Sequence, residues 1–212
     1  MLRKLALPLL GLLLVGLLAS PAIAKSYRID AADVDVIVND DATLSVTERL
    51  TYNFSGAFSG AYRDIPLRAG ESLSDITVTD SQGTYDLGGC VLLGCLSPAG
   101  LFGVDEIPGY VRVVWHYSAA DETREFTLAY TMNGVATAYD DVIDVNLQVW
   151  GDQWPVGADL VTARIHVPGE PQEGDVYVWG HPYGIDGSTS LGEDGTSPSL
   201  EATNVPSESW VE

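Results

Sequence analysis

The chain has 212 residues, of which 30 are acidic and 10 basic, so its formal net charge is −20 at pH 7. That charge argues against nucleic acid and anionic lipid headgroups as partners, whereas a cation, a basic protein surface or a neutral sugar is compatible with it. The acidic residues are spread along the chain, which favours a general role in solubility over one cationic partner. Hydrophobic residues make up 46% of the sequence, so we expect a globular protein with a sizeable core.

Residues 1–24 have the pattern of a secretory signal peptide. Arg3 and Lys4 form a basic start, residues 5–18 are apolar without an acidic residue, and Ala22-Ile23-Ala24 is a small-x-small cleavage pattern. A membrane-spanning helix needs about 20 apolar residues, and this run is shorter. A cleaved signal peptide is therefore preferred, and an uncleaved membrane anchor is the alternative. We therefore expect an exported protein with one domain, residues 25–212.

Residues 29–54 have the pattern of a β-hairpin. Apolar residues occupy alternate positions over 43–54, and Glu48 is the one charged residue on that face. Val34, Val36 and Val38 alternate with polar residues before a short polar turn. Because side chains alternate between the two faces of a strand, these patterns predict two antiparallel strands with one half-buried face.

The rest of the chain also has a period of two residues and no long helical period. Residues 119–122 are turn-like, so 110–130 forms a predicted second hairpin. Segments 81–109 and 184–198 are glycine-rich and are predicted loops. The number of short strands predicts an all-β fold, an antiparallel β-sandwich of immunoglobulin-like architecture. Further strands are expected at 75–79, 110–117, 124–130, 143–149, 161–167, 175–179, 200–205 and from Trp210 onward.

Cys90 and Cys95 form a predicted disulfide, because an oxidising compartment favours pairing of two nearby cysteines. A zinc site would need further ligands, and His116, His166 and His181 do not cluster in the sequence. The spacing of the cysteines also excludes a Cys-x-x-Cys redox motif.

Glu48 needs a partner, because a carboxylate on an apolar face is costly when unpaired. Arg63 is the predicted partner, in a segment of glycines and aromatics (54–67) that we expect to form a loop. A structural ion pair is the preferred interpretation, and a catalytic acid with a raised pKa is the alternative.

The acidic stretch 138–146 is a weak candidate for a calcium site. Asp140, Asp141, Asp144 and Asn146 offer oxygen ligands, but their spacing matches no calcium loop, so a solvated strand face is preferred. No metal or cofactor is therefore expected.

Signals for catalysis and for sugar binding are also weak. The chain contains no Gly-x-Ser-x-Gly, Ser-x-x-Lys or His-Glu-x-x-His motif. Trp115, Trp150, Trp154 and Trp179 could stack on sugars, but aromatic residues in a β-sandwich are more often part of the core.

Several short sequence blocks follow one another in the order expected for one bacterial family of unknown function. They resemble the N-terminal extracytoplasmic domain of the YciQ-like predicted membrane proteins. The most specific block is Gly60-Ala61-Tyr62-Arg63-Asp64-Ile65-Pro66. The resemblance implies an extracytoplasmic β domain, one or more membrane spans and a glycine-rich tail, but no activity. We therefore expect the sequence to be truncated, with the membrane region following Glu212, and we interpret 84–104 as an insertion. The other blocks are 27–30, 44–48, 52–54, 114–117, 138–142 and 148–154.

The expected role is an interaction or sensing module of a membrane-anchored cell-envelope protein, with an envelope protein or glycan as partner. One alternative is a glycan-acting hydrolase that uses two carboxylates. Another is a structural domain that packs on its own membrane region. The residues expected to bind the partner are Tyr62, Arg63, Asp64, Tyr139, Asp140 and Asp141.

Overall fold

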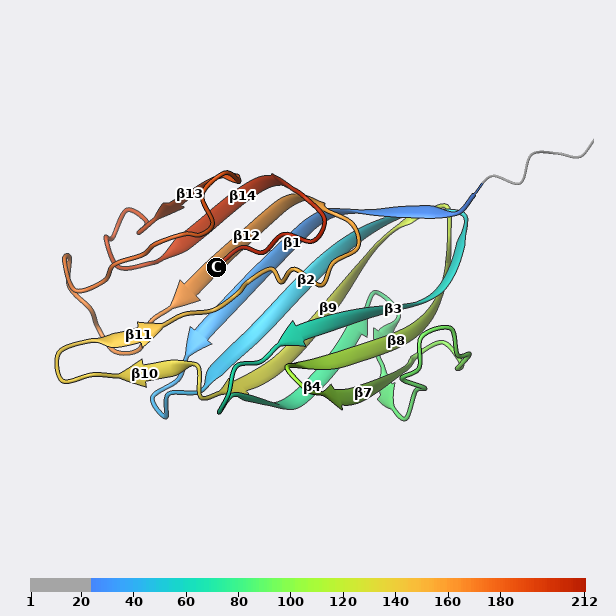
Figure 1. The fold of residues 1–212 in the computed structure, drawn as a ribbon, viewed down its shortest axis with the longest axis horizontal. Coiled ribbons are helices and arrows are strands. Elements are labelled where there is room, and N and C mark those ends of the chain that lie inside the picture. The colour runs from blue at the N-terminus through green and yellow to red at the C-terminus, as the bar shows by residue number, and fades with distance from the viewer. Residues whose placement is uncertain (1–23) are drawn as a thin grey trace, which may run out of the picture.

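The structure is a computed structural model that describes residues 24–212, and the predicted signal peptide lies outside the described residues except for Ala24. All regular secondary structure in this range is β-strand (Figure 1). The first strands are β1 (Ser26–Val38), β2 (Leu44–Ser55), β3 (Ala57–Pro66), β4 (Ser72–Asp80), β5 (Gly83–Thr84), β6 (Asp86–Leu87) and β7 (Leu101–Ile107). They are followed by β8 (Tyr110–Ala120), β9 (Thr123–Asn133), β10 (Ala136–Ala138), β11 (Ile143–Val145), β12 (Ala158–His166), β13 (Asp186–Ser190) and β14 (Ser199–Val205).

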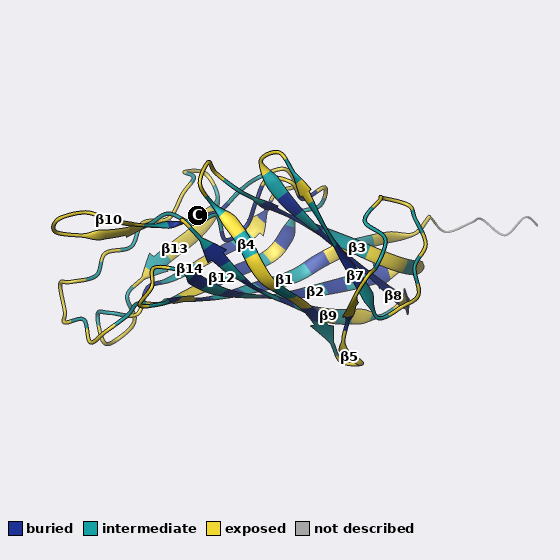
Figure 2. Ribbon diagram, turned by 90° about the horizontal axis from the view of Figure 1, so that it is seen from below, coloured by how far each residue is buried: buried dark blue, intermediate teal, exposed yellow. Residues whose placement is uncertain are grey.

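The strands form a sandwich-like arrangement of two main sheets. The larger sheet has eight strands in the order β13-β14-β12-β1-β2-β9-β4-β5, and the smaller has four in the order β3-β8-β7-β6. Figure 2 shows the smaller sheet lying over one half of the larger one. Strands β10 and β11 form a separate two-stranded hairpin. The all-β sandwich prediction is therefore confirmed. The finer prediction, an immunoglobulin-like architecture, stays a prediction. The eight-stranded sheet is wider than the sheets of an immunoglobulin domain.

The predicted first hairpin is present, with β1 antiparallel to β2. Val36 lies opposite Val46, and both side chains are buried. On its other side β1 pairs in parallel with β12, so the larger sheet is mixed and not purely antiparallel. A sequence period of two cannot distinguish these pairings, because side chains alternate in both.

The predicted second hairpin is wrong. Strand β8 pairs with β3 and β7, whereas β9 pairs with β2 and β4. The chain crosses between the sheets at Asp121, beside the crossing from β2 to β3 at Gly56. The Gly56 amide donates to the Asp121 carboxylate at 2.7 Å, and the Phe54 amide donates to the Glu122 carbonyl at 2.9 Å. These bonds hold the two crossings together at one corner of the sandwich.

Residues 54–67 are mainly strand β3 and not the predicted loop. Gly60 sits in this strand because a Cβ there would lie 3.2 Å from the Trp115 carbonyl oxygen of β8, which is a tight contact. Glycine therefore marks close approach of two backbones here and not a turn. Four other local predictions, the loops 81–109 and 184–198 and the strands 175–179 and 143–149, also need correction. Residues 101–107 and 186–190 are strands, 175–179 is not, and only Ile143–Val145 of 143–149 is regular strand. Near Trp210 the structure has one isolated bridge, between Val211 and Trp150.

One hydrophobic core joins the sheets. Leu50, Tyr52 and Phe126 of the larger sheet and Val113 and Trp115 of the smaller sheet are at most 2% exposed and belong to the same cluster. A core shared by both sheets is typical of a single domain. No helix in residues 24–212 is long and apolar enough to cross a membrane.

The predicted disulfide between Cys90 and Cys95 is present, in the segment before β7. The Cys90 carbonyl lies 2.8 Å from His116 Nε2, which fixes this segment against β8. The buried His116 thus contacts the backbone of the cysteine segment.

We expect loss of the disulfide to lower the free energy of unfolding by about 2 kcal/mol and to leave the fold intact. The reason is that the cysteines are 5 positions apart and close only a short loop. Urea unfolding of the Cys90→Ser, Cys95→Ser double variant measures this effect, with the unmodified protein in reductant as control. Complete failure of the variant to fold would contradict the expectation.

Candidate functional site

Arg63 is buried between the two sheets and forms the predicted pair with Glu48. Its Nε lies 2.9 Å from Glu48 Oε2 and its Nη2 lies 3.0 Å from Oε1, so both carboxylate oxygens accept a guanidinium hydrogen bond. Tyr130 also donates to Glu48 Oε1, at 2.6 Å. Arg63 and Glu48 are each 2% exposed. A carboxylate held this way connects β2, β3 and β9.

The electrostatics of this cluster favour the charged pair. Burial opposes the charge on Arg63, but the Glu48 carboxylate outweighs it and raises the pKa of Arg63. Burial, with the Glu48 charge beside it, raises the pKa of the Tyr130 hydroxyl well above its ordinary value. Arg63 therefore remains a cation and Tyr130 a neutral donor.

Two tryptophans complete the surroundings of Arg63. The guanidinium carbon lies 5.3 Å from the ring centroid of Trp154, in cation–π geometry, and Trp154 stacks on Trp150 at 4.5 Å. A Cβ on Gly151 would lie 3.4 Å from Arg63 Nη1, an ordinary contact distance, so Gly151 borders the guanidinium. The blocks 60–66 and 148–154, distant in sequence, thus pack against each other.

Asp64 points to the opposite face of β3, because neighbouring side chains alternate along a strand. It accepts two hydrogen bonds from Arg112, each at 2.7 Å, and is 5% exposed. The Arg112 guanidinium also lies 4.9 Å from the ring centroid of Tyr62. Arg63 and Asp64 are therefore inside the protein, with their charges paired.

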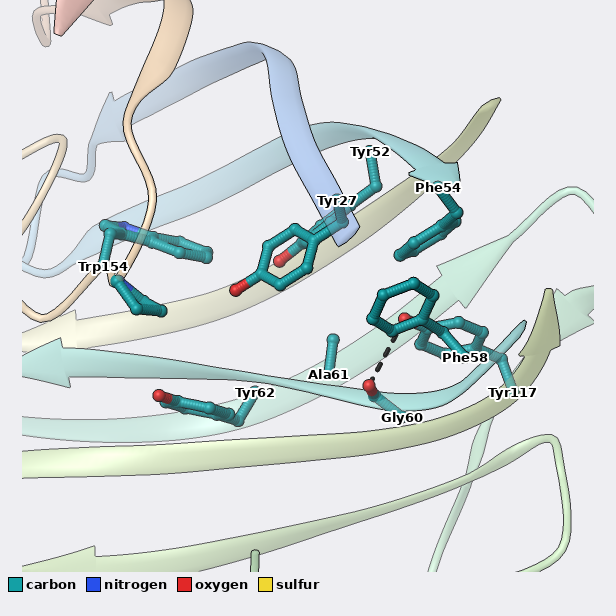
Figure 3. Close-up of a pocket in the computed structure, with 10 residues that line it drawn as sticks. Tyr27, Tyr52, Phe54, Phe58, Gly60, Ala61, Tyr62, Tyr117 and Trp154 are labelled. Carbon is teal, nitrogen blue, oxygen red and sulfur yellow. Dashed lines mark hydrogen bonds between the residues drawn. The ribbon is translucent and has the colours of Figure 1, made fainter. Parts of the chain in front are cut away.

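Tyr62 lines an aromatic cavity of about 140 Å³. Figure 3 shows Tyr27, Tyr52 and Trp154 on one side of this cavity and Ala61 and Tyr62, from β3, on the other. None of the lining residues carries a charge. The complete lining is Tyr27, Tyr52, Phe54, Phe58, Gly60, Ala61, Tyr62, Tyr117, Trp154 and Pro155.

Two lining residues carry a buried polar atom without a hydrogen-bond partner in residues 24–212, the Tyr52 hydroxyl and the Trp154 indole Nε1. Tyr52 is 2% exposed, and its oxygen has no hydrogen-bond partner among residues 24–212. By contrast, the Tyr117 hydroxyl donates to the Gly60 carbonyl at 3.3 Å. A buried hydroxyl without a partner costs stability, so this group on the cavity wall calls for an explanation.

The other predicted binding residues lie away from the cavity. Tyr139, Asp140 and Asp141 are exposed at the tip of the β10–β11 hairpin, which projects from one end of the molecule (Figure 1). Asn146, a predicted oxygen ligand, instead accepts a hydrogen bond from Arg68. Within residues 24–212 no three His, Cys, Asp or Glu side chains gather where they could hold a metal ion.

Sequence reasoning missed the cavity because its walls come from β1, β2, β3, β8 and residues 154–155. The alternating aromatics of β2 indicated a core strand, and nothing in the pattern shows that the core is incompletely filled there.

The tryptophans differ in their exposure. Trp115, Trp150 and Trp154 are at most 4% exposed, whereas Trp179 is 72% exposed.

Comparison with known proteins identifies the family. The family described as "Predicted membrane protein (DUF2207) N-terminal domain" matches residues 28–212, so the chain belongs to it. The resemblance to a family of predicted membrane proteins is thereby confirmed. No curated protein matches the chain.

Several solved structures share a distant likeness. A putative protease from Parabacteroides distasonis is 10% identical with a TM-score of 0.43, covering 86% of this chain and 36% of its own. The M1 zinc metallopeptidase from Deinococcus radiodurans is 14% identical with a TM-score of 0.42, covering 87% of this chain and 41% of its own. The chain thus spans about two fifths of these structures, and likenesses this distant carry no argument about activity.

We expect Glu48→Gln to lower the free energy of unfolding by about 3–5 kcal/mol, because it leaves the buried Arg63 charge uncompensated. Thermal and urea unfolding measure the loss. The exposed Glu125 on β9 offers a matched control, and Glu125→Gln should change stability by less than about 0.5 kcal/mol. Equal melting temperatures for the two variants would refute the role assigned to the pair.

We expect stability to fall as the pH rises above about 10, where tyrosines of the unfolded chain ionise. Burial raises the pKa of Tyr52 and Tyr130 well above that value in the folded protein, so the unfolded state binds fewer protons there. An ultraviolet titration of tyrosinate, followed together with circular dichroism, tests this. These two hydroxyls should ionise only as the protein unfolds, and ionisation of all ten tyrosines in the intact fold would contradict the expectation.

Proposed function

We propose that this N-terminal domain of a predicted membrane protein is an exported interaction module on the extracytoplasmic side of the cell envelope. Its family and its predicted signal peptide support this placement. In this proposal the membrane region follows Glu212. The ligand is an envelope protein that inserts one aromatic side chain into the cavity beside Tyr52.

The buried, unpartnered hydroxyl of Tyr52 is the observation that carries the proposal. An apolar cavity of about 150 Å³ is large enough for a benzene ring, and the present one is close to that size, at about 140 Å³. A ring with one polar group, such as the side chain of tyrosine, would fill the aromatic walls and pair with the Tyr52 hydroxyl.

The same cavity favours binding over glycan hydrolysis. Hydrolysis with two carboxylates requires an acid and a base on either side of the sugar bond, and none of the ten lining residues is acidic. Glu48, buried next to Arg63, already has both oxygens engaged. The rigid ion pairs behind β3 instead hold the cavity wall in place for recognition.

The free side-chain analogue p-cresol tests this proposal. We expect it to bind the chain with a dissociation constant on the order of millimolar, as suits a small fragment. Tyr52→Phe should weaken binding about two- to tenfold, the value of one hydrogen bond, while changing stability little. Ligand-observed NMR and protein chemical shifts of Tyr27 and Ala61 measure the affinity and its location.

Ala61→Phe should fill the cavity and abolish p-cresol binding. Ala57, on the same strand but exposed, provides the matched control, and Ala57→Phe should bind like the unmodified protein. Binding that survives Ala61→Phe would overturn the site. Binding of N-acetylglucosamine in place of p-cresol would overturn the proposed aromatic ligand in favour of a glycan.

A further inference from the structure

Three aromatic side chains are exposed within seven residues, outside the cavity. Tyr177 is 68%, Trp179 72% and Tyr183 100% exposed. Tyr177 and Trp179 stack with their ring centroids 6.0 Å apart. Three exposed aromatic side chains this close together indicate a contact surface, because burying each ring would release ordered water.

The segment that carries these rings is attached to the end of the described chain. The His181 amide donates to the Glu212 carbonyl at 2.9 Å, and the Glu212 amide donates to the His181 carbonyl at 3.1 Å. The neighbouring Val211 pairs with Trp150 of the core. Residues 177–183 are thus fixed beside Glu212, where the proposed membrane region begins.

We propose that Tyr177, Trp179 and Tyr183 form a membrane-contact surface that seats the domain on the zwitterionic headgroups of its own membrane. This inference rests on the membrane attachment after Glu212 that is part of the proposed function. Tryptophan and tyrosine suit this position, because their rings are apolar and their N–H and O–H groups remain hydrated at the headgroup level.

The charge of the surroundings selects the kind of lipid. Glu173 and Asp175 precede the aromatic rings and are exposed, and Asp186 follows them. Anionic headgroups would be repelled by these carboxylates, so a zwitterionic surface is the compatible one.

The geometry of the chain provides a matched control. In Figures 1 and 2, β1 begins at the opposite end of the molecule from the loops that precede β13. A tether at Glu212 therefore brings the aromatic segment to a membrane, whereas a tether at Lys25 holds the other end against it.

The test attaches residues 25–212 to phosphatidylcholine vesicles that contain a small fraction of nickel-chelating lipid, by a histidine tag placed either after Glu212 or before Lys25. Tethering raises the local concentration to the order of millimolar, so a weak contact becomes measurable. Brominated phosphatidylcholine should quench the exposed tryptophan with the C-terminal tether and not with the N-terminal one. These measurements use a Trp210→Phe background, because Trp210 is only partly buried and lies two residues from the C-terminal tether. In this background Trp179→Phe should remove the quenched signal, since Trp115, Trp150 and Trp154 are buried.

Two further changes sharpen the result. The double variant Tyr177→Ser, Tyr183→Ser should reduce the quenching at least twofold, and so should exchanging a third of the lipid for phosphatidylglycerol. Circular dichroism confirms that each variant is folded.

Equal quenching with both tethers, no quenching with the C-terminal tether, or quenching that survives Trp179→Phe would each overturn the proposal. A response of Trp179 to soluble N-acetylglucosamine oligomers without lipid would also overturn it, by assigning the aromatic pair to a glycan. In the complete protein, the membrane spans could instead shield Trp179 from water without any quenching by brominated lipid. That result would also overturn the proposal. Binding of p-cresol is measured separately, so failure of the cavity function and failure of this surface are distinguishable.

Discussion

The fold depends on keeping the charge of Arg63 inside the sandwich. A guanidinium removed from water is costly, and only a carboxylate with matching geometry offsets that cost. Glu48 supplies it from the opposing sheet, and Tyr130 supplies a further hydrogen bond to the same carboxylate. Because the pair joins β3 of the smaller sheet to β2 and β9 of the larger one, it fixes how the two sheets face each other. Apolar contacts alone are less directional and would tolerate small shifts between the sheets.

The cavity follows from the same constraint. The ring of Trp154 lies over the Arg63 guanidinium, and Trp154 in turn forms one wall of the cavity with Tyr27 and Tyr52. On the other face of β3, Asp64 and Arg112 pair beside Tyr62. The charged groups therefore lie outside the cavity lining, and the lining itself is aromatic and neutral. Such a space recognises shape and one hydrogen bond, which suits selective binding of a side chain.

The two proposed contacts have different physical requirements, and they lie on different parts of the molecule. The cavity is formed by rigid strands that share one core, so its shape is set before a ligand arrives. The aromatic segment 177–183 lies outside the sheets and is fixed mainly by the paired backbone bonds between His181 and Glu212. A module that is seated on a membrane at one segment and binds a partner at another could report the presence of that partner to the rest of the protein.

The sequence by itself determined the features that depend on neighbouring residues: the strand period, the first hairpin, the cysteine pair, and the need of Glu48 for a cation. It also carried the family resemblance, through the block around Arg63. Only the tertiary structure decided which sheet each strand joins. Strand β2 turns back on β1 in a hairpin, whereas β9 crosses to the other sheet after β8. Both strands have the same alternating pattern, so the pattern cannot distinguish the two cases. The incompletely filled space beside Tyr52 and the exposure of Trp179 were also decided there. Both depend on how segments far apart in the chain pack, and residue order alone does not specify those distances.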